Sequence, residues 1–194
     1  MKNILVKSIN LLIAGSVIFM LGCGTQYTFN NQSYTKPSEA LAAHSNFSTN
    51  IETGIKPITD SPIASSVMVV TPSKETCQKL GITKTGSPSK EMMDYLGEYL
   101  KSDFAYFNKY IQKSELFTSV EHKIVDFPAK FVKDLDKKYD AVVYLDMVSP
   151  SQASWYLLSS NSDKPQQINF DNIAAPGLPK VNSWLMDIKS KLEK

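Results

Sequence analysis

Five segments of alternating type follow one another in the middle of the chain, and this alternation restricts the fold more than any other feature. They are a strand at 66–71, a helix beginning at 87–91, a strand at 117–125, a helix at 129–138 and a strand at 139–147. Strands that alternate with helices favour layered α/β folds. We therefore expect a single α/β domain with a mixed small sheet of about four or five strands, packed by a long helix, a second helix and a C-terminal helix.

The long helix carries a stripe of apolar and aromatic side chains that recur every three or four positions. The stripe consists of Met92, Met93, Leu96, Leu100, Phe104, Phe107 and Ile111, widened by Tyr95, Tyr99, Tyr106 and Tyr110. We expect it to pack on the sheet, and the alternative is that Phe104, Phe107 and Tyr110 form the wall of a ligand cavity. Weaker strands are expected at 155–158 and 167–170, and a closing amphipathic helix follows from Val181 to Leu192.

The N-terminus has the pattern of an export signal. Lys2 and Lys7 form a short basic region, and the chain from Ile9 to Leu21 is almost entirely apolar. This run is shorter than the roughly 20 apolar residues of a membrane-spanning helix. It matches the apolar region of a signal peptide, which is about 7–15 residues long.

Met20-Leu21-Gly22-Cys23 ends this apolar run and resembles a lipobox, the cleavage site of bacterial lipoproteins. The resemblance implies that residues 1–22 are removed and that Cys23 carries the acyl chains that anchor the protein. Met20 and Leu21 depart from the commonest residues of the motif, whereas Gly22 and Cys23 fit it. Gly24 is not the Asp that signals inner-membrane retention in the enterobacterial pattern, so the resemblance implies the outer membrane, facing the periplasm.

The composition of the exported part gives no support to nucleic acid or phosphate groups as partners. Once Lys2 and Lys7 are removed, its lysines equal its 19 acidic residues in number. This balance gives no electrostatic reason to expect nucleic acid as a partner. The chain contains no arginine, the residue best suited to bidentate recognition of phosphate. Cys77 is the one thiol left after lipidation of Cys23, and we expect it to be buried as a small apolar side chain.

The segment after Cys23 is expected to form a small N-terminal module. Alternation on either side of Asn30-Asn31 predicts a short hairpin over 27–34, and the Ala-rich stretch that begins near Pro37 predicts a helix. Residues 45–64 are polar and contain two prolines, so we expect a tether there. The predicted organisation is a signal peptide at 1–22, a lipidated hairpin, helix and tether at 23–64, and a globular domain at 65–194.

The region 65–148 resembles a group of envelope lipoproteins and periplasmic domains that includes the LpoB activators of cell-wall synthases and the N-terminal domain of TolB. The resemblance is carried by the Val-rich strand ending near Pro72, the long helix, the Leu-Phe-x-x-Val element at Leu116, and the Tyr-Asp-Ala-Val strand at Tyr139. It implies a sheet like that of an anticodon-binding domain, and it does not cover the Trp155 region or the closing helix.

Motifs of catalysis are absent from the sequence. The two histidines, His44 and His122, have no partners at the spacing of a zinc site, and His122 is expected at the surface. The chain also has no Gly-x-Ser-x-Gly elbow and no phosphate-binding loop. We therefore expect no cofactor, no metal and no catalytic residue, although a triad assembled in space is compatible with the sequence.

The polar stretch 149–156 contains Trp155 and Tyr156, and aromatic residues in a polar loop are typical of a binding surface. Two interpretations remain open: Trp155 and Tyr156 bind a partner, or they begin the next strand.

The sequence as a whole favours a non-catalytic envelope lipoprotein that contacts another envelope protein or the cell wall. The alternatives are a periplasmic hydrolase of peptidoglycan or glycans and a lipoprotein that binds a small ligand or lipid.

Overall fold

The computed structural model describes residues 27–80, 89–132, 138–149, 152–162, 164–170 and 176–194. Its main sheet has five strands in the order β4-β3-β5-β6-β7. Their bounds are β3 Ala64–Pro72, β4 Phe117–Val125, β5 Ala141–Ser149, β6 Gln152–Ser159 and β7 Gln166–Ile168. Strand β3 is parallel to β4 and β5, whereas β6 and β7 continue the sheet in antiparallel fashion. The expected mixed α/β sheet is confirmed.

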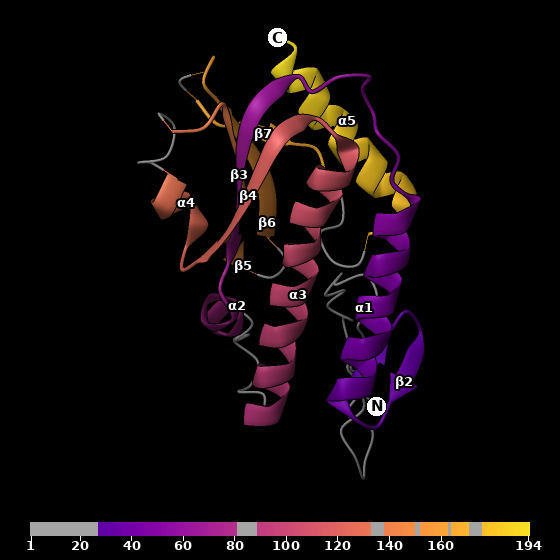
Figure 1. Ribbon diagram of the computed structural model, residues 1–194. Helices are drawn as coiled ribbons and strands as arrows, with labels where there is room; N and C mark the ends of the chain where they lie inside the picture. Colours follow the sequence, from indigo (N-terminus) through magenta and orange to yellow (C-terminus); the bar gives the residue numbers. More distant parts are fainter. Residues whose placement is uncertain (1–26, 81–88, 133–137, 150–151, 163, 171–175) are drawn as a thin grey trace, which may run out of the picture.

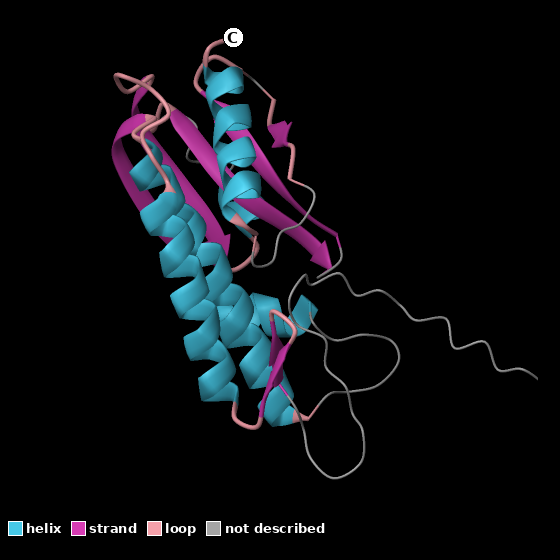
Figure 2. Cartoon of the chain, turned by 90° about the vertical axis from the view of Figure 1, so that its right-hand side faces the viewer, coloured by secondary structure: helices cyan, strands magenta, loops and turns pink. Residues whose placement is uncertain are grey.

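Helices lie on both faces of this sheet (Figures 1 and 2). One face is covered by α3 (Lys90–Ser114) and α5 (Leu178–Leu192), with α1 (Pro37–Gly54) packed against α3, and the other face carries α4 (Pro128–Val132). The short helix α2 (Lys74–Leu80) follows β3 directly and packs against α3. The expected long and C-terminal helices are therefore present. Of the helix expected at 129–138, α4 is the described part, and residues 133–137 lie outside the described residues. Helix α2 is an element that the sequence did not predict.

The connections explain why β3 is so apolar. The chain passes from β3 to β4 through α2 and α3 on one face, and from β4 to β5 through α4 on the other. Strand β3 is therefore covered on both sides: Val67 and Val69 belong to the core under α3, and Met68 and Val70 belong to the core under α4. A strand buried on both faces has a continuous apolar sequence instead of an alternating one.

The aromatic stripe of α3 packs into the main core. The Ser89 side chain caps the helix by accepting a hydrogen bond from the Met92 N–H. Further along, the Phe107 ring lies 4.6 Å from the Trp155 ring and 4.9 Å from the Trp184 ring of α5. The packing interpretation of the stripe is confirmed.

The N-terminal hairpin is also confirmed. Strands β1 (Tyr27–Phe29) and β2 (Gln32–Tyr34) pair in antiparallel fashion around Asn30 and Asn31, which both have positive φ. Two consecutive residues in this conformation form the turn that matches the twist of a two-residue hairpin. Tyr27 and Phe29 are almost completely buried against α1 and α3, so the hairpin belongs to the core.

The expected tether over 45–64 is wrong. Helix α1 continues to Gly54, and its Ile51 side chain is buried against the rest of the protein. The segment that follows is fixed as well, because the Ile58 N–H donates to the Ser114 carbonyl and the Ile63 N–H donates to the Leu116 carbonyl. The polar sequence misleads because only one side of α1 faces α3, and sparse apolar residues suffice for that side. Residue 64 is therefore not a domain boundary, because the segment before it packs into the same structure as the sheet.

Candidate functional site

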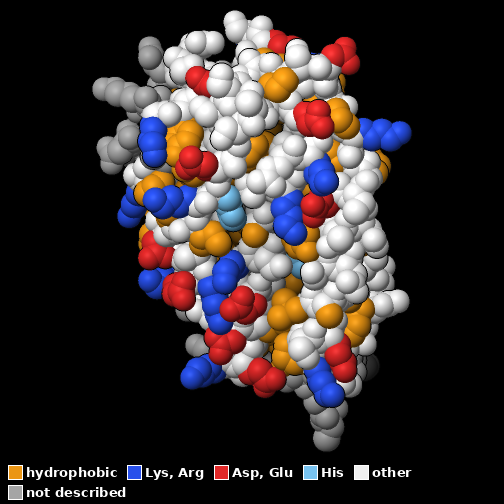
Figure 3. All heavy atoms as spheres, in the orientation of Figure 1, with side chains coloured by type: hydrophobic (Ala, Val, Ile, Leu, Met, Phe, Trp, Pro, Cys, Tyr) orange, Lys and Arg blue, Asp and Glu red, His pale blue; other side chains and the backbone are white. Residues whose placement is uncertain are grey.

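A groove of about 500 Å³ lies between the first turns of α1 and α3. Both helices begin at the end of the molecule that carries the hairpin (Figure 1). The residues around the groove are Pro37 and Leu41 from α1 and Lys90, Glu91, Asp94, Tyr95 and Glu98 from α3. Figure 3 shows hydrophobic side chains gathered in this region between the two helices, with charged side chains around them. The groove thus combines an apolar floor with a charged rim.

On the α3 side, the rim of the groove carries carboxylates, and Lys74 of α2 neutralises part of their charge. The Lys74 ammonium lies 3.0 Å from a Glu98 carboxylate oxygen and 3.6 Å from Asp94. The hydrogen bond to Glu98 is the main reason that the pKa of Lys74 is raised. Lys74 therefore stays protonated and ties α2 to this wall of the groove.

The groove is joined to the N-terminal hairpin through Tyr27. The Tyr27 hydroxyl donates a 2.9 Å hydrogen bond to Glu91, and its ring lies 4.8 Å from the Tyr95 ring. Burial, followed by the hydrogen bond to Glu91, raises the pKa of Tyr27. The first described residue of the chain therefore contacts two residues of the groove.

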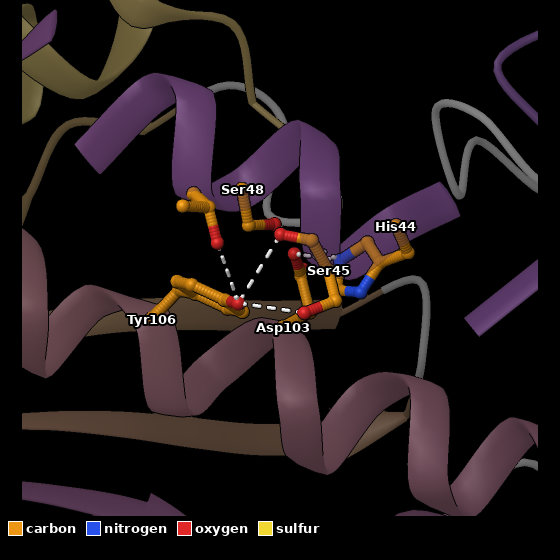
Figure 4. A network of polar contacts seen from close by, with 6 residues as sticks. His44, Ser45, Ser48, Asp103 and Tyr106 are labelled. Atoms are coloured by element: carbon orange, nitrogen blue, oxygen red, sulfur yellow. Dashed lines mark hydrogen bonds and ion pairs between the residues drawn. The ribbon is translucent and has the colours of Figure 1, made fainter. Parts of the chain in front are cut away.

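A closed polar cluster lies deeper between the same two helices (Figure 4). The His44 Nε2 atom lies 2.9 Å from Asp103 Oδ1 and 3.4 Å from the Ser48 hydroxyl. All three side chains are at most 1% exposed. Nearer the surface, the Tyr106 hydroxyl lies 2.9 Å from the Ser45 hydroxyl. These contacts join α1 to α3 through polar groups that only one relative placement of the helices satisfies.

The cluster contains the residue types of a catalytic triad but not its arrangement. In a triad the carboxylate and the hydroxyl contact opposite nitrogens of the imidazole. Here Asp103 and Ser48 face the same nitrogen of His44, and the imidazole is enclosed. The geometry is that of a buried ion pair or hydrogen bond that joins two helices.

The side chains of Trp155 and Tyr156 lie on opposite faces of the sheet. Both lie on β6, where successive side chains point to opposite faces of the sheet. Trp155 is fully buried, 5.2 Å from the Trp184 ring, so its assignment to a partner surface is wrong. Tyr156 is half-buried on the other face and stacks on Tyr144 at 5.4 Å. The interpretation that Trp155 and Tyr156 belong to a strand is correct.

His122 and Asp126 lie at the end of the sheet where the parallel strands finish. The His122 Nε2 atom lies 2.9 Å from the Thr71 hydroxyl, and burial lowers the pKa of His122. His122 is thus half-buried and not the exposed histidine expected from the sequence. Hydrogen bonds from Ser73 and Thr76 to Asp126 join α2 to the end of β4 and lower the pKa of Asp126. His122 and Asp126 therefore have structural roles: they link neighbouring elements at this end of the sheet.

Cys77 lies on α2 and is fully buried, as expected. Burial, with a smaller effect of the Glu75 carboxylate, raises the pKa of the Cys77 thiol to about 12. We expect Cys77 in the folded protein to resist maleimide at pH 8, and to react fully in 6 M guanidinium, because the thiolate is the nucleophile. Mass spectrometry of the Cys23→Ala chain, which has no other thiol, measures this directly. Rapid labelling without denaturant would contradict the burial of Cys77.

Cys23 and the signal segment 1–22 lie outside the described residues. Within the described ranges, no helix has the length and apolar character needed to cross a bilayer. The same ranges contain no cluster of three or more histidine, cysteine or carboxylate side chains suited to a metal ion. Comparisons with protein-family models, curated proteins and solved structures find no match to this chain.

Sequence reasoning missed the groove and the His44–Asp103 pair. Asp103 is an acidic residue inside the apolar stripe of α3, directly before Phe104. A charged residue in a buried stripe needs a partner, since burial of an isolated charge is costly. The position of Asp103 could therefore have indicated a buried pair. Its partner His44 lies 59 positions away, however, and follows only from the packing of α1 on α3.

Proposed function

We propose that this protein is a bacterial envelope lipoprotein whose α/β domain is a non-catalytic interaction module. The lipid on Cys23 holds it on the outer membrane, facing the periplasm, and the domain contacts another envelope protein or the cell wall. The lipobox residues Gly22 and Cys23 and the apolar run before them motivate the anchor.

One observation carries the proposal: Tyr27 of β1 is buried in the core and lies only four residues after Cys23. Four residues span at most about 14 Å when fully extended. A lipid on Cys23 would therefore hold the domain directly against the bilayer, without the long tether that the sequence suggested. The surface that binds the partner must then be accessible while the domain lies against the membrane.

The arrangement of the chain supports a distal partner surface. The hairpin and the start of α1 lie at one end of the domain, and the C-terminus and the end of α5 lie at the other (Figure 1). On α5, Met186 is 50% exposed. With the hairpin end at the membrane, α5 would face the periplasmic space.

The alternatives differ in how much support they have. The enclosed His44 and its contacts to Asp103 and Ser48 offer no open nucleophile for the hydrolase alternative. The lipid-binding alternative has a specific observation in its favour, since a groove of about 500 Å³ falls within the usual range of small-ligand sites.

Intact mass of membrane-extracted protein tests the anchor. We expect the wild type to lack residues 1–22 and to carry the mass of acyl chains, and we expect Cys23→Ala to carry none. The matched control Cys77→Ala should keep the acyl mass, because it changes only the buried thiol. An unmodified Cys23 in the wild type would refute the lipoprotein assignment.

Crosslinking of intact envelopes tests the interaction. We expect a partner that is recovered reproducibly with the wild type and lost with Cys23→Ala, because loss of the lipid anchor changes where the domain is held. Recovery of no reproducible partner from an acylated wild type would refute the interaction role and leave the anchor standing.

A further inference from the structure

We propose that the groove between α1 and α3 holds one acyl chain of the lipid on Cys23. This inference rests on the proposed function, because it requires Cys23 to be acylated. It adds an intramolecular binding site whose ligand is the protein's own anchor.

Chain length brings the lipid to the groove. Cys23 precedes Tyr27 by four residues, so the two Cα atoms are at most about 14 Å apart. Tyr27 touches Glu91 and Tyr95, and both of these residues line the groove. An acyl chain on Cys23 therefore starts at most about 14 Å from a residue that touches the groove.

The chemistry of the groove matches a hydrocarbon chain with a polar attachment. Pro37, Leu41 and the Tyr95 ring supply apolar surface, and charged groups stand at the rim. Lys74 pairs with the carboxylates of Asp94 and Glu98, and the Tyr27 hydroxyl donates to Glu91, so each carboxylate at the rim has a partner that offsets part of its charge. Apolar contact inside and polar contact outside is the usual composition of a site for an amphipathic ligand.

Attachment favours this occupant over a free lipid. A ligand joined by a short link has an effective concentration in the millimolar range, without any new contact. If Cys23 carries three acyl chains, two remain in the bilayer, and two suffice for stable anchoring. One chain in the groove would also fix the orientation of the domain, because α1 and α3 would then be held at a set position above the bilayer.

Thiol labelling of full-length protein in phosphatidylcholine vesicles tests the proposal. Leu41→Cys places a probe on the α1 wall and Asp94→Cys places one on the α3 wall, each in the lipidated chain and in Cys23→Ala. Occupancy of about nine-tenths should slow maleimide labelling of both probes roughly tenfold in the lipidated chain relative to Cys23→Ala. Buried Cys77 does not contribute to the signal. The second probe keeps the test valid if Leu41→Cys disturbs folding.

Ser33→Cys is the matched control, because Ser33 is exposed on the same hairpin and does not line the groove. Its labelling rate should be equal in the two backgrounds. Slow labelling of all three positions in the lipidated chain would mean that the bilayer shields this end, and would overturn the proposal. Equal rates at Leu41→Cys and Asp94→Cys in both backgrounds would overturn it as well. Intact mass of each sample separates these results from a failure of acylation itself.

Discussion

Asp103→Ala is expected to lower the free energy of unfolding by about 3 kcal/mol, where the cost of leaving a buried polar group unpaired meets that of breaking a buried ion pair. Asp103 is 1% exposed and lies 2.9 Å from His44, which is fully buried. Without the carboxylate, the imidazole stays between α1 and α3 where water cannot replace the lost contact. Urea denaturation of the full chain measures the change, and fluorescence of the buried Trp155 and Trp184 reports on the core.

Two further variants distinguish this effect from a general loss of charge on α3. Asp94→Ala removes a carboxylate that is 50% exposed and paired with Lys74, so it should cost at most about 1 kcal/mol. The double variant His44→Leu/Asp103→Leu should be less destabilised than Asp103→Ala, because two apolar groups can replace a buried pair at small cost. Equal effects of Asp103→Ala and Asp94→Ala would show that the buried pair does not hold the helices together.

Phe29→Ala is expected to cost about 3–5 kcal/mol, the range for removal of a buried phenylalanine ring. Phe29 is 3% exposed, and its ring lies 5.4 Å from His44 and 5.6 Å from Phe47. The large effect follows from the position of the hairpin inside the main core. The measurement is the same urea denaturation of the full chain.

Gln32→Ala is the control within the same hairpin, because Gln32 is exposed. We expect it to change the stability by less than about 0.5 kcal/mol. If Phe29→Ala were as mild as Gln32→Ala, the hairpin would be an appended arm, and the short distance between the fold and Cys23 would lose its meaning.

The sequence predicted the five strands of the main sheet and helices α3 and α5 because their apolar patterns are strong. The continuous apolar run of β3 and the three-to-four repeat of α3 each identify one type of structure. The second half of α1 was missed because its polar residues hide a narrow apolar side around Ile51. Helix α2 was missed because seven residues are too few to establish a helical period.

The candidate site was harder to predict than the fold. Burial of Cys77 followed from its residue type, whereas Trp155 was ambiguous because a polar loop and the first residues of a strand have the same composition. The groove depends on how the first turns of α1 and α3 diverge, and His44 meets Asp103 across 59 positions of sequence. Such features arise from tertiary packing, which no local pattern encodes.

The position of α5 has a consequence for the order in which the chain folds, and for the proposed lipoprotein this order matters. Trp184 of α5 completes the cluster around Phe107 and Trp155, and Lys189 donates a hydrogen bond to the Ile58 carbonyl, 131 positions earlier. The core therefore cannot close until nearly the last residue of the chain is available to fold. Parallel pairing of β3 with β4 and β5 also joins distant segments, and such topologies fold slowly. Acylation at residue 23 would precede both events, so the chain would complete its folding while already bound to the membrane.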